Sequence, residues 1–167
     1  KLRYDCVIPV SGGKDSTWQT IKCLEYGLNP LAVTWKAPQR TKIGQDNLEN
    51  LISLGVDHID WTINPKIEKK LTLESFKKFG SVAIPMHLAI FNIPVLIASH
   101  FKIPYVIWGE NSAVEYGNLN KKENEKNLTN KWFKNYGVTN NTEAKHWVSK
   151  SFPKNKLSSY FKYKTYS

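Results

Sequence analysis

The fold is decided by the stretch YDCVIPVSGGKDSTW, residues 4–18, which joins an apolar run to a short polar loop and a helical pattern. Residues 4–10 indicate a buried strand, and Pro9 fits there only near the strand's end, where no ladder hydrogen bond is needed. From Ser16 onward apolar side chains recur at helical spacing until Gly27, a natural helix stop. The stretch therefore predicts a strand, a loop and a helix in direct succession.

The loop between this strand and helix has the composition of an anion-binding site. A loop that enters a helix faces free backbone N–H groups and the positive end of the helix dipole, which both attract anions. Gly12 and Gly13 let the backbone approach a ligand closely, and Lys14 adds a positive charge. Hydroxyl groups add further donors, and they belong to Ser11, Ser16 and Thr17. We therefore predict that this loop binds phosphate groups.

The loop differs from two common phosphate-binding sequences. It lacks the Gly-x-x-x-x-Gly-Lys-Ser/Thr spacing of a Walker A loop and the Gly-x-Gly-x-x-Gly spacing of a dinucleotide loop. A carboxylate beside a phosphate is explained by a bound cation, so Asp15 predicts a magnesium ion held together with the phosphates. The alternative is a polar turn that Ser16 caps and that binds nothing.

Downstream, apolar stretches alternate between strand and helix patterns. Strands are expected at residues 31–35, 58–63 and 105–108, and helices at residues 46–54, 65–79 and 86–102, the last broken or kinked at Pro94. This alternation predicts an α/β fold, a doubly wound parallel sheet with helices on both faces.

The composition changes after residue 117. Residues 118–130 are nearly all Asn, Lys and Glu, as in a linker, and the aromatic residues that follow indicate one or two docked helices. Residues 158–167 have no evident place in the fold. We expect a core at residues 1–117 and, at 118–167, a basic linker and C-terminal helical segment of the same domain.

The formal charge of +10 is unevenly distributed. Residues 1–117 hold 13 basic and 11 acidic residues, net +2, whereas residues 118–167 hold 11 lysines and 3 glutamates, net +8. A basic tail can attract nucleic acid, an acidic partner or an anionic sugar nucleotide. The alternative, which we favour, is a solvated lysine-rich surface.

Cysteine usage and hydropathy predict the cellular compartment of the protein. Cys6 and Cys23 lie on buried patterns, which predicts two reduced thiols and a cytoplasmic location. The longest apolar stretch, residues 82–97, is interrupted by two prolines, His87 and Asn92, so no membrane span is expected. No signal peptide is visible.

The loop SGGKDS, residues 11–16, resembles the Ser-Gly-Gly-x-Asp-Ser loop of the PP-loop ATP pyrophosphatases. The resemblance implies a Rossmann-like fold of the adenine nucleotide alpha hydrolase type, in which the loop grips the pyrophosphate end of ATP. These enzymes cleave ATP between the α and β phosphates and attach AMP to a carbonyl oxygen. A nitrogen or sulfur nucleophile then displaces the AMP.

Other segments resemble the N-acetyl sugar amidotransferases of the pseudaminic acid and lipopolysaccharide type, and the likeness covers residues 1–118. The segments are NPLAVTW, TKIGQDNLENLISLGVDHIDWTINPK, AIPMHLAIFNIP and IPYVIWGENSAVEYGN. The resemblance implies that an acetamido group of a bacterial sugar becomes an acetamidino group, with ATP and Mg²⁺ as cofactors. ATP activates the amide oxygen, and ammonia displaces AMP. The implied partner is an N-acetylated sugar or sugar nucleotide.

The chain departs from that family at three points. The cysteine-rich zinc segment that many members carry before the first strand is absent, and Ala83 to Met86 stand where some members have Cys-x-x-Cys. No zinc site is therefore expected. Full-length members are also longer, so we expect this chain to lack part of the substrate site.

Two residues after the strand at 105–108 are candidates for the site. In doubly wound sheets the first strand and the strand after the crossover lie side by side, and ligands bind at that point. Glu110 is expected to contact magnesium or substrate, and Asn111 an amide or ATP, unless they form an ordinary strand-end turn. Glu115 and Tyr116 are expected to extend this wall toward the substrate.

The end of the second strand and its loop supply further candidates. Thr34 and Trp35 lie where this fold places the adenine and ribose, although a structural role explains them equally well. Lys36, Arg40 and Thr41 follow, and they could meet phosphates or a sugar carboxylate, or remain solvated.

His87 begins an apolar helix. It either bonds to the backbone, which the sequence alone favours, or acts as an acid, base or sugar contact, and the resemblance leaves these two roles evenly supported. The other histidines, at positions 58, 100 and 146, are expected to be structural or on the surface.

The expected catalytic residues are Lys14, Asp15 and Glu110. No cysteine adjoins a histidine or a glycine-rich elbow, so we predict that a partner glutaminase supplies ammonia. A PP-loop tRNA-modifying enzyme is the alternative that the basic tail favours, but the missing cysteines argue against thiolation, and nucleic acid is not the expected partner. The other alternative is a truncated domain that binds ATP without activity.

Overall fold

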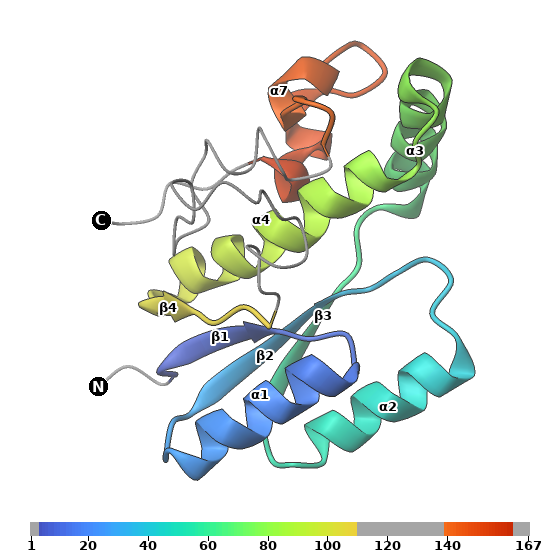
Figure 1. Ribbon diagram of the computed structural model, residues 1–167. Coiled ribbons are helices and arrows are strands. Elements are labelled where there is room, and N and C mark those ends of the chain that lie inside the picture. Colours follow the sequence, from blue (N-terminus) through green and yellow to red (C-terminus); the bar gives the residue numbers. More distant parts are fainter. Residues whose placement is uncertain (1–3, 110–138, 162–167) are drawn as a thin grey trace, which may run out of the picture.

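The computed structural model describes residues 4–109 and 139–161 of the 167-residue chain (Figure 1). The strands are β1 (Cys6–Pro9), β2 (Pro30–Trp35), β3 (Asp57–Trp61) and β4 (Tyr105–Val106). The helices are α1 (Lys14–Glu25), α2 (Lys42–Ile52), α3 (Pro65–Phe79), α4 (Ala83–Phe101) and α7 (Ala144–Trp147). Two 3₁₀ turns follow, η1 (Lys154–Lys156) and η2 (Ser158–Tyr160).

The four strands form one parallel sheet in the order β3-β2-β1-β4. The chain moves outward from β1 to β3, and then α3 and α4 return it to the other side of β1. Helices α1 and α2 cover one face of the sheet and α4 covers the other (Figure 1). The predicted doubly wound α/β fold is confirmed, and β1 and β4 meet at its switch point.

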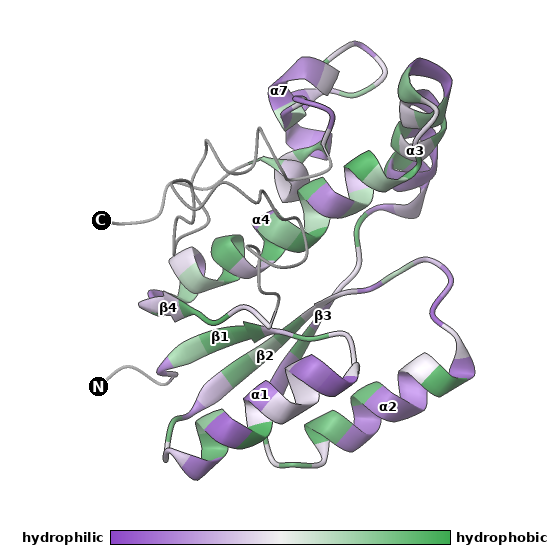
Figure 2. Ribbon diagram, viewed as in Figure 1, coloured by the Kyte–Doolittle hydropathy of each residue, from purple (hydrophilic) through white to green (hydrophobic). Residues whose placement is uncertain are grey.

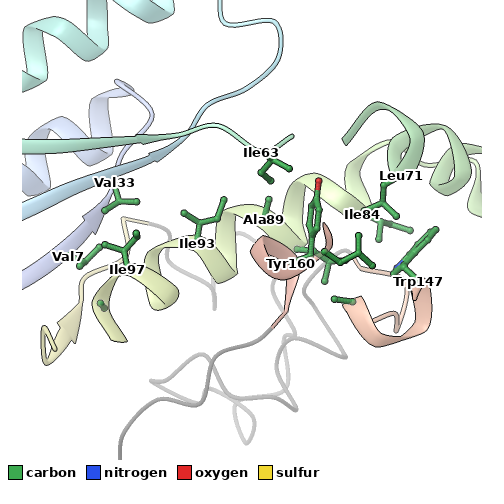
Figure 3. Close-up of a cluster of buried hydrophobic side chains, with 14 of the residues drawn as sticks. Val7, Val33, Ile63, Leu71, Ile84, Ala89, Ile93, Ile97, Trp147 and Tyr160 are labelled. Atoms are coloured by element: carbon green, nitrogen blue, oxygen red, sulfur yellow. The ribbon is translucent and has the colours of Figure 1, made fainter. Parts of the chain in front are cut away.

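Successive residues of the strands face opposite sides of the sheet, as the pleat requires. Along β1, Cys6 and Ile8 belong to the buried cluster beneath α1 and α2, and Val7 between them belongs to the cluster beneath α4. Figure 3 shows Val7 and Val33 beside Ile97 and Ile93 of α4. Both faces of the central strand β1 are covered, which explains why β1 and most of α4 are hydrophobic, whereas the edge strand β3 is largely hydrophilic (Figure 2).

Helices α1 and α2 begin earlier than their apolar periodicity predicts. Helix α1 starts at Lys14, because Gly13 takes an extended backbone and serves as its N-cap. Helix α2 starts at Lys42, because the Thr41 hydroxyl accepts a hydrogen bond from the Gly44 N–H and caps the helix. Capping rather than hydrophobic spacing determines where both helices begin.

Helix α4 runs from Ala83 to Phe101, so of the two expected outcomes at Pro94, a break or a kink, the break is excluded. Proline removes the hydrogen bond to the Ile90 carbonyl. Burial of Ile93 and Ile97 against the sheet compensates for that loss (Figure 3). Within the described residues, α4 is the one helix long and apolar enough to cross a membrane, and 56% of that stretch is buried inside the protein.

Residues 139–161 pack onto α3 and α4 and complete the core on that side. The Asn92 amide donates to the carbonyl of Tyr160 at 2.8 Å, and the Trp61 indole donates to Ser159 Oγ at 3.1 Å. The expectation that residues 158–167 have no place in the fold is wrong for 158–161, because Tyr160 is fully buried (Figure 3). Residues 162–167 lie outside the described residues.

Candidate nucleotide-binding site

A cavity of about 360 Å³ opens at the carboxyl ends of β1 and β2. This is the size of a small-molecule site, and it lies at the switch point where α/β folds bind ligands. The loop after β1, the end of β2, α4 and the segment after β4 all contribute to its walls. The lining residues outside α4 include Val10, Ser11, Gly13, Asp15, Ser16, Thr34, Trp35, Arg40, Trp108 and Gly109, of which Asp15 and Ser16 belong to the first turn of α1.

Gly12 holds the loop against helix α2. Its φ is +80°, and a Cβ atom there would lie 2.8 Å from the Leu48 backbone nitrogen and 3.1 Å from the Asn47 carbonyl carbon. A side chain at this position would meet rigid helix backbone as well as an unfavourable φ. The loop needs glycine here because of a neighbour more than thirty residues away in sequence.

The first turn of α1 faces the cavity without a side-chain cap. Gly13, the N-cap, has no side chain, and the hydroxyls of Ser16 and Thr17 donate to its carbonyl at 3.1 and 2.9 Å. Ser16 therefore does not cap the helix as the alternative expected, and whether the turn binds a ligand stays a prediction. The N–H groups of the first turn remain available to an anion in the cavity.

Lys14 and Asp15 begin helix α1 with exposed side chains, and Asp15, but not Lys14, lines the cavity. The Lys14 ammonium and the Asp15 carboxylate are 3.5 Å apart, and their side chains are 92% and 69% exposed. Magnesium is commonly held by one or two carboxylates together with substrate phosphates, and Asp15 fits that arrangement. Among the described residues, no cluster of three or more His, Cys, Asp or Glu side chains could hold a metal ion through protein groups alone.

Thr34 reaches the cavity, but protein groups occupy its hydroxyl. Thr34 is 5% exposed, and Oγ1 donates to the Val10 carbonyl at 2.8 Å. The same Oγ1 lies 2.9 Å from Nε2 of His58, on the neighbouring strand β3. Its predicted contact with a nucleotide stays a prediction, and the hydroxyl proton is already committed to Val10.

Trp35 lines the cavity, and a hydrogen bond to a buried side chain holds its indole in place. Its indole N–H donates to Glu68 Oε1 at 2.9 Å, and Glu68 is 8% exposed. Burial raises the pKa of Glu68, although the Trp35 hydrogen bond acts in the other direction. Sequence analysis missed Glu68, because a glutamate among the lysines of α3 resembles an ordinary exposed residue.

Arg40 lines the cavity, but its guanidinium is paired. It forms two hydrogen bonds to the Asp60 carboxylate, at 2.7 and 2.8 Å, and a third to Gln45 Oε1 at 3.0 Å. Burial alone would raise the pKa of Asp60, yet the hydrogen bonds and charge of Arg40 lower it below its ordinary value. Arg40 therefore anchors the loop after β2 to β3.

The opposite wall comes from the segment after β4 and from α4. The carbonyl of Trp108 accepts a hydrogen bond from the Gln19 amide at 2.9 Å, and the Trp108 ring lies 5.4 Å from the Phe91 ring. A Cβ atom at Gly109 would lie 3.8 Å from the Ser16 nitrogen, so this segment adjoins the loop after β1. Four predicted site residues that follow lie outside the described residues: Glu110, Asn111, Glu115 and Tyr116.

His87 lies on the same stripe of α4 as two residues of the cavity wall, Ile90 and Pro94, which follow it by three and seven positions. Its Nδ1 is 2.9 Å from the Ala83 carbonyl. A carbonyl only accepts, so Nδ1 carries a proton. His87 is not among the lining residues, and its role stays a prediction.

The two cysteines are buried and free. Burial raises the pKa of Cys6 to about 12, and burial also raises the pKa of Cys23. Neither thiol is ionised at neutral pH, so neither has the character of a catalytic nucleophile.

No protein-family model and no curated protein matches the sequence. Among solved structures, the chain is similar to NMN synthetase from Francisella tularensis, with 21% sequence identity and a TM-score of 0.45. The match covers 62% of this chain and 44% of that chain, so this chain spans less than half the length of the matched structure. At this identity the likeness concerns the fold alone.

Proposed function

We propose that the chain binds ATP in this cavity and promotes cleavage between its α and β phosphates. The observation that carries the proposal is the loop from Ser11 to Ser16. It opens into the cavity beside an uncapped helix N-terminus, and Gly12 is packed so closely on α2 that only glycine fits. Such an arrangement binds phosphate through backbone N–H groups.

The loop residues have distinct roles in this proposal. The N–H groups of the first turn of α1 bind the pyrophosphate end of ATP. The Lys14 ammonium neutralises charge on the departing pyrophosphate, the kind of electrostatic contact that contributes most to such reactions. Asp15 would hold Mg²⁺ together with the phosphates, and the ion would shield their charge.

The finer proposal is an amidotransferase that acts on a sugar N-acetyl group. It rests on the sequence resemblance, and the apolar walls of Trp108 and α4 provide a place for an acceptor. His87 Nε2 would bind the acceptor, and Glu110, Asn111, Glu115 and Tyr116 would complete the site. The amide oxygen attacks the α phosphate and pyrophosphate leaves; ammonia then adds to the carbon, and AMP leaves.

Ammonia would come from a partner glutaminase in the cytoplasm. The raised pKa values of Cys6 and Cys23 support this, because neither thiol is an activated nucleophile. Glutamine hydrolysis by the isolated protein would contradict it.

The test uses the purified chain with ATP, Mg²⁺, ammonium and a panel of N-acetylated sugar nucleotides and nonulosonic acids. Mass spectrometry follows AMP and the change from amide to amidine in each sugar. AMP together with an amidine supports the full proposal. AMP without a changed sugar supports the proposed cleavage of ATP but overturns the proposal that a sugar is the acceptor. ATP binding without AMP supports a binding domain alone, and no ATP binding overturns the proposal.

A tRNA-modifying enzyme is the second candidate, because the basic residues gather in one region. Helix α3 and residues 139–161 hold nine lysines and three glutamates, and they are in contact where Lys78 Nζ lies 5.2 Å from the Trp147 ring. Binding of tRNA that weakens steeply with salt would favour this candidate. Binding that is weak at every salt concentration would remove it.

A further inference from the structure

Three groups on neighbouring segments form a hydrogen-bonded chain behind the phosphate loop. His58 lies on β3, Thr34 on β2, and Val10 directly after β1. Thr34 Oγ1 is 2.9 Å from His58 Nε2 and 2.8 Å from the Val10 carbonyl oxygen. These hydrogen bonds therefore link β3, through β2, to the residue that directly precedes the loop after β1.

The position of each proton in this chain follows from the partners. The Thr34 hydroxyl has one hydrogen, and it must point at the Val10 carbonyl, which only accepts. Thr34 Oγ1 then accepts from His58, so the proton of the imidazole is on Nε2. Burial lowers the pKa of His58 and the Arg40 charge lowers it further, whereas Asp60 raises it. The net direction is downward, so His58 is neutral at neutral pH.

The Val10 carbonyl marks the point where the chain leaves the sheet. The Val10 N–H still donates to the Val33 carbonyl at 2.9 Å, as in the ladder of β1 and β2. The carbonyl of the same residue is held by a side chain instead, and it shares its peptide unit with Ser11, the first residue of the loop. The Thr34 hydrogen bond thus orients the first peptide of the loop, and His58 orients Thr34.

We propose that His58, acting through the Thr34 hydroxyl, is a positioning residue that sets where the phosphate loop leaves the sheet; this inference rests on the proposed binding of ATP. Hydrogen bonds in a chain polarise one another, so the two bonds support each other. His58 is not among the residues that line the cavity, so it acts on ATP affinity through Thr34.

The test compares Thr34→Val, Thr34→Ser, His58→Leu and the double variant Thr34→Val/His58→Leu. Calorimetry measures ATP affinity, and amide hydrogen exchange follows residues 11–13 without ATP. Thr34→Val is expected to weaken ATP binding roughly five-fold, the effect of losing one neutral hydrogen bond, and to speed exchange in the loop. Thr34→Ser keeps the hydroxyl and is expected to rescue the slow loop exchange, and with it most of the ATP affinity, that Thr34→Val loses. His58→Leu weakens binding by itself but adds nothing in the double variant.

Ser75→Ala is the matched control, because it also removes a buried hydroxyl bonded to a carbonyl, that of Ser81 at 2.6 Å, far from the cavity. It is expected to lower stability without changing ATP affinity. Additive effects of the two single variants, or wild-type affinity and exchange in His58→Leu, would overturn the inference. So would an NMR spectrum of the free protein showing the His58 proton on Nδ1. If the wild type binds no ATP, the proposed function fails, whereas the loop's exchange rates and the His58 tautomer still decide the positioning role.

Discussion

At the scale of single residues, a comparison of Gly12 with Gly27 separates two effects on stability. One is the close contact between the Gly12 backbone and helix α2, and the other is the positive φ that both glycines share. Both have positive φ, +80° and +72°, but only Gly12 has backbone within 3 Å of where a Cβ would lie. Gly27→Ala is expected to lower the free energy of unfolding by about 1–2 kcal/mol, the cost of left-handed backbone. Gly12→Ala is expected to cost more and to weaken ATP binding. Denaturant unfolding and calorimetry measure both. Equal losses in the two variants would show that α2 does not constrain the loop.

Lys14 is expected to act on the rate and not on the fold. Its side chain is almost fully exposed, so Lys14→Ala should leave thermal unfolding unchanged. The rate of AMP formation should fall by roughly two to three powers of ten, the scale of losing one transition-state contact. Lys42→Ala is the control, because Lys42 is another exposed lysine in a first helical turn, that of α2, and lies outside the loop from Ser11 to Ser16. A wild-type rate in Lys14→Ala would remove its catalytic role.

The pKa of Glu68 makes stability depend on pH. Burial raises that pKa above its ordinary value of 4.5, so between the two values the folded protein binds a proton that the unfolded chain has lost. Stability therefore falls as pH rises through this range. Glu68→Gln removes the charge and keeps the acceptor for Trp35, so we expect higher stability at pH 7 and no gain near about pH 3.5. Thermal unfolding across pH measures this.

The control for Glu68 is Glu49→Gln, which removes an exposed glutamate of α2. It is expected to change stability little at either pH. A Glu68→Gln gain that is the same at both pH values would mean that side-chain shape, and not charge, causes the effect.

At the scale of elements, Asn92 joins α4 to the C-terminal segment. Its buried amide donates to the carbonyls of Leu88 and Tyr160, at 2.6 and 2.8 Å. Asn92→Leu has similar size but leaves the Tyr160 carbonyl without this donor, and we expect a loss of about 1–3 kcal/mol in the free energy of unfolding. Asn50→Leu, at an exposed position of α2, should change it little. Equal values for the two variants would contradict the proposed link.

Elements were predicted well where one local signal decides them. Helix α3 occupies the expected residues, because Asn64 caps it, Pro65 occupies its first turn and Gly80 ends it with a φ of 64°. Helix α2 was placed too late, because Lys42 and Gly44 give its first turn no apolar periodicity. The continuity of α4 through Pro94 depends on burial against the sheet, which no local pattern contains.

At the scale of the whole molecule, residues 139–161 are part of the core. Leu157 and Tyr160 are almost completely buried in the same cluster as α4 and the sheet (Figure 3). Leu157→Ala is therefore expected to lower the free energy of unfolding by about 2–5 kcal/mol. The exposed Leu54 gives the control, and Leu54→Ala should cost far less. Denaturant unfolding followed by the fluorescence of the tryptophans measures both, and a cost for Leu157→Ala no greater than the control would contradict this role.

The sequence alone determined the order of strands and helices, the parallel α/β class and the loop from Ser11 to Ser16. Apolar periodicity, glycine and hydroxyl composition are local properties, so they can be recognised without knowing which segments meet. The tertiary structure decided the partners: Thr34 with His58, Arg40 with Asp60, and Trp35 with Glu68. Each pair joins residues at least twenty positions apart, and its energy exists only once the strands and helices are packed. Sequence analysis therefore located the loop from Ser11 to Ser16, but it could not show that Thr34 joins His58 to the Val10 carbonyl just before that loop.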